Sequence, residues 1–98
     1  MKMLPGMTVI VPCDFNQTKA ATLAIADYRG PVYLRFGRPK WPNFTTEDGS
    51  DFVIGKAQII NEGNDITIFA CGHLVWKAFE SGKILEEKGL SVEVINIH

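Results

Sequence analysis

The sequence predicts an α/β fold, because short apolar runs and helical stretches alternate along the chain. The apolar runs are rich in β-branched residues and bounded by turn residues, as strands are. The resulting order is β-α-β, a connecting segment, and then β-β-α-β. Buried strands need helices on both faces of their sheet, and each half supplies only one helix. We therefore expect a partial three-layer parallel or mixed sheet that is truncated at both ends.

The first half is expected to form a β-α-β unit. Residues 7–11 are an apolar run that stops at a proline, which predicts a buried strand. A helix follows over about 17–28, and Asp14 or Asn16 can cap it by accepting backbone N–H bonds. The helix presents a narrow face of small residues, which would allow close packing against a sheet. Residues 31–36 then form the second strand.

The middle of the chain changes character, because no helical or strand period survives there. It is rich in proline, asparagine, aspartate and glycine, interrupted by Trp41 and Phe44. We expect a connecting segment that is held down by these two aromatic side chains. The chain accordingly divides into residues 1–40, a linker over 41–51, and residues 52–98.

The second half is expected to begin with a hairpin, in which apolar runs within 52–60 pair with a central strand at 66–70. An amphipathic helix follows over 74–88, with Gly89 as its C-terminal cap. The last strand spans 90–97. Because a helix joins the last two strands, they should be parallel.

Composition excludes several classes of protein. The chain has 98 residues, enough for one compact domain, and a formal charge of -1 without a basic block, so no nucleic-acid partner is expected. The first residues lack the apolar region of a signal peptide, and no apolar run is long enough to span a membrane. Cys13 and Cys71 lie in apolar stretches, which predicts buried free thiols and a cytoplasmic location. No cysteine and histidine pattern predicts a metal site.

Three side chains invite both a structural and a chemical interpretation. His73 follows a predicted strand, so it either opens the next helix or reaches a site at the carboxyl edge of the sheet. Asp14 is either a helix cap or a general base, and no partner base or metal ligand is evident, which favours the cap. His98, the last residue, is expected to have no special role.

A group of cations follows the strand at residues 31–36. Arg35, Arg38 and Lys40 lie around Gly37, which permits an unusual backbone turn. The rigid guanidinium fork of arginine binds phosphate through two hydrogen bonds, and sites in α/β proteins lie at strand ends. The segment is therefore either an anion-binding site or an exposed charged loop.

These residues together resemble the transketolase family. Residues 31–39 resemble the segment that ends its pyrimidine-binding domain, where a strand runs into an Arg-Pro turn. Residues 5–14 are similar to an earlier strand of that domain with the helix that follows it. Residues 51–57 and 63–73 are similar to the entry into the C-terminal domain and its first central strand. The resemblance covers essentially the whole chain in order.

The resemblance implies an activity and one site residue. The family transfers a two-carbon ketol unit between phosphorylated sugars, as in the pentose phosphate pathway, with thiamine diphosphate and a divalent cation. Its active site lies at a dimer interface, where the arginine of the Arg-Pro turn contacts the sugar phosphate. That position is Arg38 here, whereas Arg35 matches no family ligand. Residues 1–40 would end the pyrimidine-binding domain, and residues 52–98 would begin the C-terminal domain.

The departures from the family pattern limit what this chain would do alone. The glutamate that activates the cofactor, and the diphosphate and metal ligands, belong to parts of the family's fold that this sequence does not match. We therefore expect no catalytic, cofactor-binding or metal-binding residue here, and no cofactor bound to the isolated chain. Exposed faces should drive self-association or binding to a complementary transketolase chain.

Two further interpretations fit the sequence. A 2-oxoacid dehydrogenase of the β type and a deoxyxylulose phosphate synthase share the same layout of strands and helices. A non-enzymatic α/β interaction module would instead have a complete fold, with its last strand covered on both faces.

Overall fold

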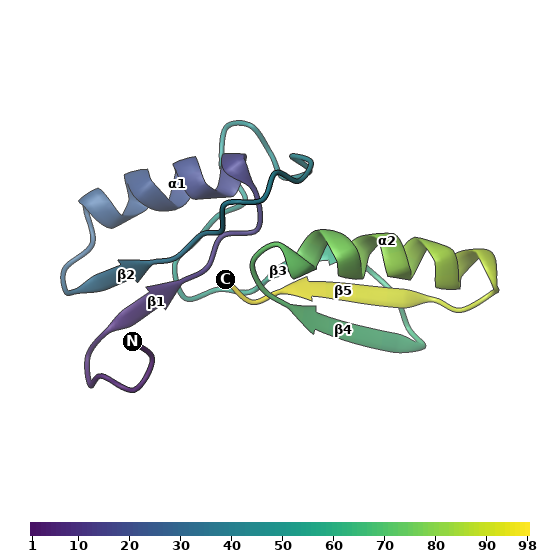
Figure 1. Ribbon diagram of the computed structural model, residues 1–98. Helices are drawn as coiled ribbons and strands as arrows, with labels where there is room; N and C mark the ends of the chain where they lie inside the picture. The colour runs from purple at the N-terminus through teal and green to yellow at the C-terminus, as the bar shows by residue number, and fades with distance from the viewer.

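The computed structural model describes residues 1–98 and confirms the α/β class. Two helices and two sheets form two lobes that lie side by side (Figure 1). The elements follow the predicted order: β1 (Thr8–Ile10), α1 (Phe15–Ala26), β2 (Val32–Leu34), β3 (Gln58–Asn61), β4 (Ile66–Ala70), α2 (Leu74–Glu87) and β5 (Val92–Asn96).

The first lobe is the predicted β-α-β unit. Strands β1 and β2 are parallel, with Thr8 opposite Val32. Helix α1 packs on them through its small residues, and Ile10, Ala21 and Phe52 form the buried cluster. Phe52 belongs to the connecting segment, which in the structure extends from the end of β2 to the start of β3, although the sequence pattern predicts a strand at Phe52. The first lobe therefore completes its core with a side chain from outside the unit.

Helix α1 begins two residues earlier than predicted, directly after Asp14. The Asp14 carboxylate accepts a hydrogen bond from the Gln17 backbone N–H at 2.8 Å, which is the predicted N-terminal cap. The helix ends at Ala26, two residues before the predicted end. The Tyr28 hydroxyl instead lies 2.9 Å from the Thr8 hydroxyl on the neighbouring strand.

The second lobe contains a mixed sheet in the order β3-β5-β4. Strands β4 and β5 are parallel, as predicted. The predicted hairpin is wrong, because β3 pairs with β5 in the antiparallel sense and β5, not β4, is the central strand. At Gly63 the chain passes so close to β5 that a Cβ atom would overlap the backbone of Val92 and Glu93. The chain therefore crosses β5 and places β4 on its far side.

Helix α2 covers one face of this sheet. Ala78, Val92 and Val94 form its buried cluster, and a Cβ atom on Gly82 would lie 3.4 Å from the side chains of both valines. Small residues on α2 therefore allow the helix to approach the sheet closely. Gly89 adopts φ 88° just after the last helical turn, which confirms the predicted C-terminal cap.

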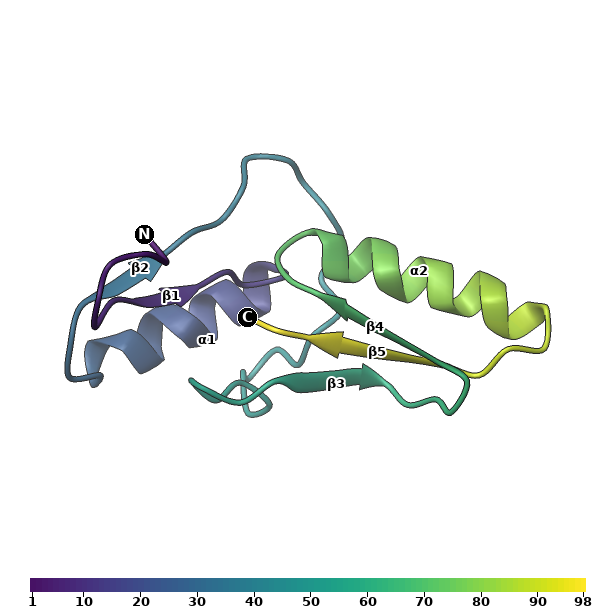
Figure 2. The same ribbon diagram turned by 90° about the horizontal axis from the view of Figure 1, so that it is seen from below.

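The connecting segment is held down by its aromatic side chains, as predicted, and these side chains contact both lobes. The Trp41 indole N–H donates a hydrogen bond to the Cys13 carbonyl at the start of α1. The Phe44 ring lies 5.4 Å from the Trp76 ring and 6.4 Å from the Phe79 ring, both on α2. Figure 2 shows this segment arching from the end of β2 toward α2.

A buried polar network lies where the lobes meet. The Asn96 side-chain amide donates to Gln17 Oε1 at 3.0 Å, and the Gln17 amide donates to Gln58 Oε1 at 3.0 Å. The Val11 backbone N–H donates to the His98 carbonyl at 3.4 Å. These bonds connect β1 and α1 of the first lobe to β3 and β5 of the second. Neither helix of the chain has the length and apolar character needed to cross a membrane.

Candidate functional site

A hollow of about 360 Å³ lies at the carboxyl ends of three strands. Ligand sites of α/β proteins lie at such edges, because the chain leaves each parallel strand there and can present side chains and backbone groups together. The hollow is lined by residues that follow β1, β2 and β4, together with Trp41: Val11, Pro12, Arg35, Phe36, Gly37, Trp41, Cys71, Gly72, His73 and Leu74. It therefore lies between the two lobes.

Two basic residues, Arg35 and His73, line this hollow. The Arg35 backbone N–H donates to the Ile10 carbonyl at 3.0 Å, so the turn after β2 is held against β1. His73 is the N-cap residue of α2 and its side chain makes no capping hydrogen bond. Its ring lies 5.6 Å from the Trp41 ring. His73 therefore opens α2, as one of the two interpretations predicts, and it also lines the hollow.

Arg38 is exposed in the segment after β2 and does not line this hollow. Its neighbours Gly37 and Pro39 line an adjoining hollow of about 540 Å³, together with Asp14 and Trp41. The structure thus leaves the Arg38 guanidinium free to meet a ligand or a second chain. A role in binding phosphate remains a prediction.

Asp14 is a structural residue rather than a candidate base. Its side chain is buried, and its carboxylate accepts the N–H groups of Gln17, Phe44 and Thr45 at 2.8–2.9 Å. The Thr45 hydroxyl donates one hydrogen bond shared between the two oxygens of this carboxylate, at 2.7 and 2.8 Å. With both oxygens engaged in this way, the carboxylate is not free to accept a substrate proton.

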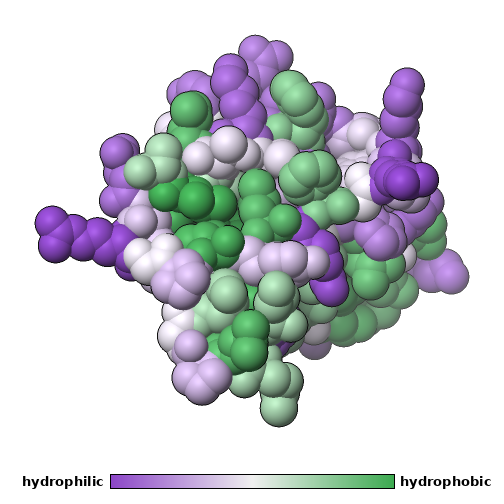
Figure 3. Space-filling model, turned by 60° about the vertical axis from the view of Figure 1, so that its left-hand side comes forward, coloured by the Kyte–Doolittle hydropathy of each residue, from purple (hydrophilic) through white to green (hydrophobic).

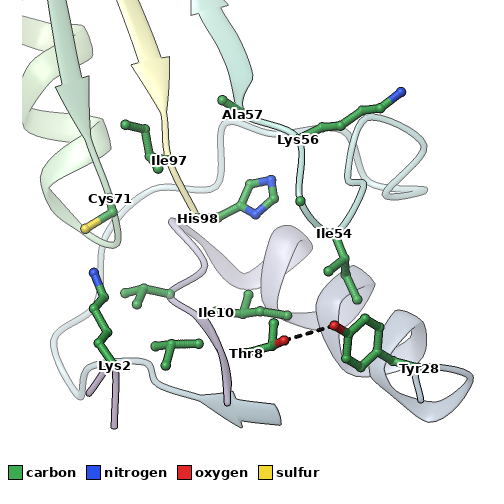
Figure 4. Close-up of a pocket in the computed structure, with 13 residues that line it drawn as sticks. Lys2, Thr8, Ile10, Tyr28, Ile54, Lys56, Ala57, Cys71, Ile97 and His98 are labelled. Carbon is green, nitrogen blue, oxygen red and sulfur yellow. Dashed lines mark hydrogen bonds between the residues drawn. The ribbon is translucent and has the colours of Figure 1, made fainter. Parts of the chain in front are cut away.

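A third hollow, of about 530 Å³, lies between β1 and the end of the chain. Figure 4 shows the His98 imidazole in it, beside the backbone that carries Lys56 and Ala57. The ring lies 4.5 Å from the Phe52 ring, and its Nε2 atom is buried without a protein partner. Burial lowers the pKa of His98, an effect opposed by the backbone of Lys56 and the charge of Asp51. No local sequence pattern around His98 indicates this environment.

Both cysteines are free, as predicted, but only Cys13 is buried as expected. Cys13 is fully buried, and burial next to the negative charge of Asp14 raises the pKa of its thiol far above the ordinary range. Cys13 is therefore an inert neutral thiol. Cys71 is half-buried and lines two of the hollows.

The residues of this chain do not fit a site for thiamine diphosphate and its divalent cation. No group of three or more histidine, cysteine, aspartate or glutamate side chains is placed to hold a metal ion. Asp14, the buried carboxylate that lines one of the hollows, accepts hydrogen bonds from the protein on both oxygens.

Comparison with known proteins gives a consistent set of similarities. Residues 55–98 match the family "Transketolase, C-terminal domain". The chain is 38% identical over 97 residues to an apulose-4-phosphate transketolase subunit of Phocaeicola vulgatus, covering 99% of this chain and 31% of that protein. It is 28% identical to 1-deoxy-D-xylulose-5-phosphate synthase of Dictyoglomus turgidum, covering 99% of this chain and 16% of that enzyme.

A solved structure is similar over the same extent. It is a split-gene transketolase described as an inactive β4 tetramer, with a TM-score of 0.93 and 39% identity over 99% of this chain and 32% of that one. Both lobes and their mutual arrangement thus match one known fold. The chain spans about a third of the length of the transketolase subunits it matches.

Proposed function

Because the chain belongs to the transketolase family, we propose that it is part of a cytoplasmic enzyme that transfers a two-carbon ketol unit between sugar phosphates. The observation that carries this proposal is the similarity to a transketolase subunit over nearly the whole chain. In this proposal, residues 1–40 end the pyrimidine-binding domain, residues 41–51 are a linker, and residues 52–98 begin the C-terminal domain.

Within that enzyme, Arg38 binds the phosphate group of the sugar substrate. Its exposure supports this role, as does its place in the turn that follows a parallel strand. A guanidinium group donates two parallel hydrogen bonds to a phosphate, which fixes the orientation of the substrate as well as its affinity. The chain itself thus supplies a substrate contact and a scaffold.

The thiamine diphosphate and divalent cation of the family belong to other parts of the assembled enzyme in this proposal. The isolated chain should then bind neither. A calorimetric titration of the chain with thiamine diphosphate and magnesium checks this. Binding tighter than about 100 μM, roughly -5.5 kcal/mol, would contradict the proposal.

The chain works as one component of an assembly with a complementary chain or with further copies of itself. The relatives support this, since one is a transketolase subunit and another is described as a tetramer. The surface supports it as well. On the sheet face opposite α2, the paired residues Ile59, Ile95 and Phe69 form a row across three strands, and Ile59 and Phe69 are 55% and 64% exposed.

Exposed apolar side chains also occur on the first lobe. Leu23 and Phe36 are 65% and 61% exposed. Figure 3 shows apolar side chains gathered on the face that includes the end of this lobe. Contiguous apolar surface of this kind favours association. Sedimentation equilibrium should therefore find the chain in oligomers, and a strictly monomeric, well-folded chain would contradict this part of the proposal.

A chimera provides the test of the enzymatic proposal. The matching 97-residue segment of the Phocaeicola vulgatus transketolase subunit is replaced by this chain, and ketol transfer is assayed with its complementary chain. We expect activity from the chimera. Arg38→Gln should raise KM for the sugar phosphate about tenfold or more, which corresponds to one lost charged hydrogen bond.

The control in this chimera is Arg29→Gln, which removes an exposed arginine just after the end of α1. It should leave KM within about twofold of the unsubstituted chimera. Equal effects of the two substitutions would contradict the role of Arg38. A folded, assembled chimera without activity would contradict the proposed function as a whole.

A second candidate function is that of a deoxyxylulose phosphate synthase. The 28% identity to the Dictyoglomus turgidum enzyme favours it over a 2-oxoacid dehydrogenase and over a non-enzymatic module. The same segment exchange in that synthase distinguishes it from a transketolase. Activity of the synthase chimera, without activity of the transketolase chimera, would reverse the order of the two proposals.

A further inference from the structure

The hollow at the carboxyl ends of β1, β2 and β4 has an unusual balance of charge. Arg35 and His73 both line it, and none of its ten lining residues is an aspartate or a glutamate. The nearby carboxylate of Asp14 lines the adjoining hollow instead, where it is held by hydrogen bonds from the protein. A ligand in the hollow would therefore meet hydrogen-bond donors and no opposing negative charge.

The two donors stand on parts of the backbone that are held in place. The Arg35 N–H is bonded to the Ile10 carbonyl, and the Gly72 N–H donates to the Val11 carbonyl at 3.3 Å. Trp41, whose indole N–H is bonded to the Cys13 carbonyl, lies against the His73 ring. Because the backbone of these turns is already fixed, a ligand would have to order only the side chains, and binding loses less conformational entropy.

We propose that this hollow binds a small phosphate monoester through Arg35 and His73, as a site separate from Arg38. An arginine fork and an imidazole N–H donate to the non-bridging oxygens of a phosphate group. The hollow, about 360 Å³ in volume, falls at the lower end of the range of ligand pockets, which suits a short sugar phosphate better than a nucleotide. The apolar side chains of Phe36 and Leu74 contact the organic part of the ligand.

The N-terminus of α2 adds to this site without being its basis. The helix begins at the hollow and carries no acidic residue in its first turn. Its dipole therefore favours an anion there. Since Arg35 comes from the first lobe and His73 from the second, a bound phosphate would connect the two lobes.

An amide NMR titration of the chain tests this inference, with glycerol 3-phosphate and inorganic phosphate as separate probes. We expect saturable shifts of the Gly72, His73 and Leu74 amides at concentrations below about 10 mM. Tighter binding of glycerol 3-phosphate supports an organic phosphate as the ligand. Equal binding supports a site that recognises the phosphate group alone.

Variants assign the site to its residues. Arg35→Gln should weaken binding at least about tenfold, or roughly 1.4 kcal/mol, and His73→Gln should weaken it by a smaller factor. Arg29→Gln, which changes an exposed arginine outside the hollow, should leave the affinity unchanged. Both Arg35 and His73 are exposed, so the variants should fold, which thermal melting checks.

Two results would overturn the inference: the absence of saturable shifts, or shifts that persist unchanged in Arg35→Gln. These results are independent of the chimera assay, because they concern the isolated chain and not ketol transfer. Failure of one experiment therefore leaves the other proposal standing.

Discussion

The two lobes of the chain are stabilised in different ways. The second lobe has two five-residue strands in a three-stranded sheet, and its buried cluster comes entirely from α2 and β5. The first lobe has two strands of three residues each, and its buried cluster needs Phe52 from the connecting segment. The same segment supplies the donors that satisfy Asp14. The first lobe thus depends on the connecting segment, whereas the second is held by its own sheet.

The substitution Asp14→Ala should show the difference in stability between the two lobes most clearly. It removes the acceptor for the N–H groups of Gln17, Phe44 and Thr45. We expect a loss of about 3–5 kcal/mol in the free energy of unfolding, because several buried donors lose their partner. Hydrogen exchange should show the loss in α1 and the connecting segment, with protection retained in β4 and β5.

The matched control is Asp27→Ala, at the other end of α1, where the aspartate side chain is exposed. It should change the free energy of unfolding by less than about 0.5 kcal/mol. Equal loss of protection in both lobes of the Asp14 variant would contradict the comparison and indicate one cooperative unit.

The converse change is Gly63→Ala, which affects the second lobe. The new methyl group would overlap the backbone of Val92 and Glu93 on the central strand. We expect about 3 kcal/mol of destabilisation, since a backbone contact cannot relax by a side-chain rotation. Urea unfolding measures the loss, and exchange should now increase in β4 and β5.

Gly37→Ala is the control for this change, because its nearest neighbour is the Pro39 ring at 3.3 Å. It should cost less than about 1 kcal/mol. A Gly63 variant as stable as the Gly37 variant would mean that the chain does not cross β5 as closely as the structure shows.

Phe44→Ala tests the contact between the connecting segment and the second lobe. It removes the ring that packs against Trp76 and Phe79. We expect about 2 kcal/mol of destabilisation, less than for a fully buried ring because Phe44 is half-buried. Fluorescence of Trp76 should shift toward that of an exposed indole, and an unchanged spectrum would contradict the packing.

The smallest expected effect is a dependence of the free energy of unfolding on pH, which arises from His98 at the junction of the lobes. Burial lowers the pKa of His98 below its unfolded value, so the folded state favours the neutral ring. This contribution is present above the unfolded pKa of about 6.5 and is lost as the pH falls below it. Stability measured by urea unfolding should decrease between neutral and mildly acidic pH.

His98→Gln should reduce this decrease, and His73→Gln, which changes an exposed histidine, should retain it. An identical pH profile for the parent chain and the His98 variant would show that another group is responsible. The two variants together distinguish the contribution of His98, at the junction of the lobes, from that of His73, in the hollow.

Local chemistry is what the sequence by itself determined. The β-branched apolar runs predicted the strands, the helical spacing of apolar residues predicted the helices, and together they predicted the order of the elements. The caps at Asp14 and Gly89 were predicted because capping depends on a few neighbouring residues. The packing of Trp41 and Phe44 was also predictable, since large aromatic side chains in a polar segment need an apolar surface.

Only the tertiary structure decided which strands pair and which side chains meet. The pairing of β3 with β5 joins residues more than thirty positions apart, and the close passage at Gly63 that enforces it leaves no local pattern. The placement of Arg35 and His73 on one hollow, and the packing of the His98 ring against Phe52, are equally non-local. The physical reason is that hydrogen-bond caps and periodicity act within one or two turns, whereas contacts between lobes depend on the packing of the whole chain.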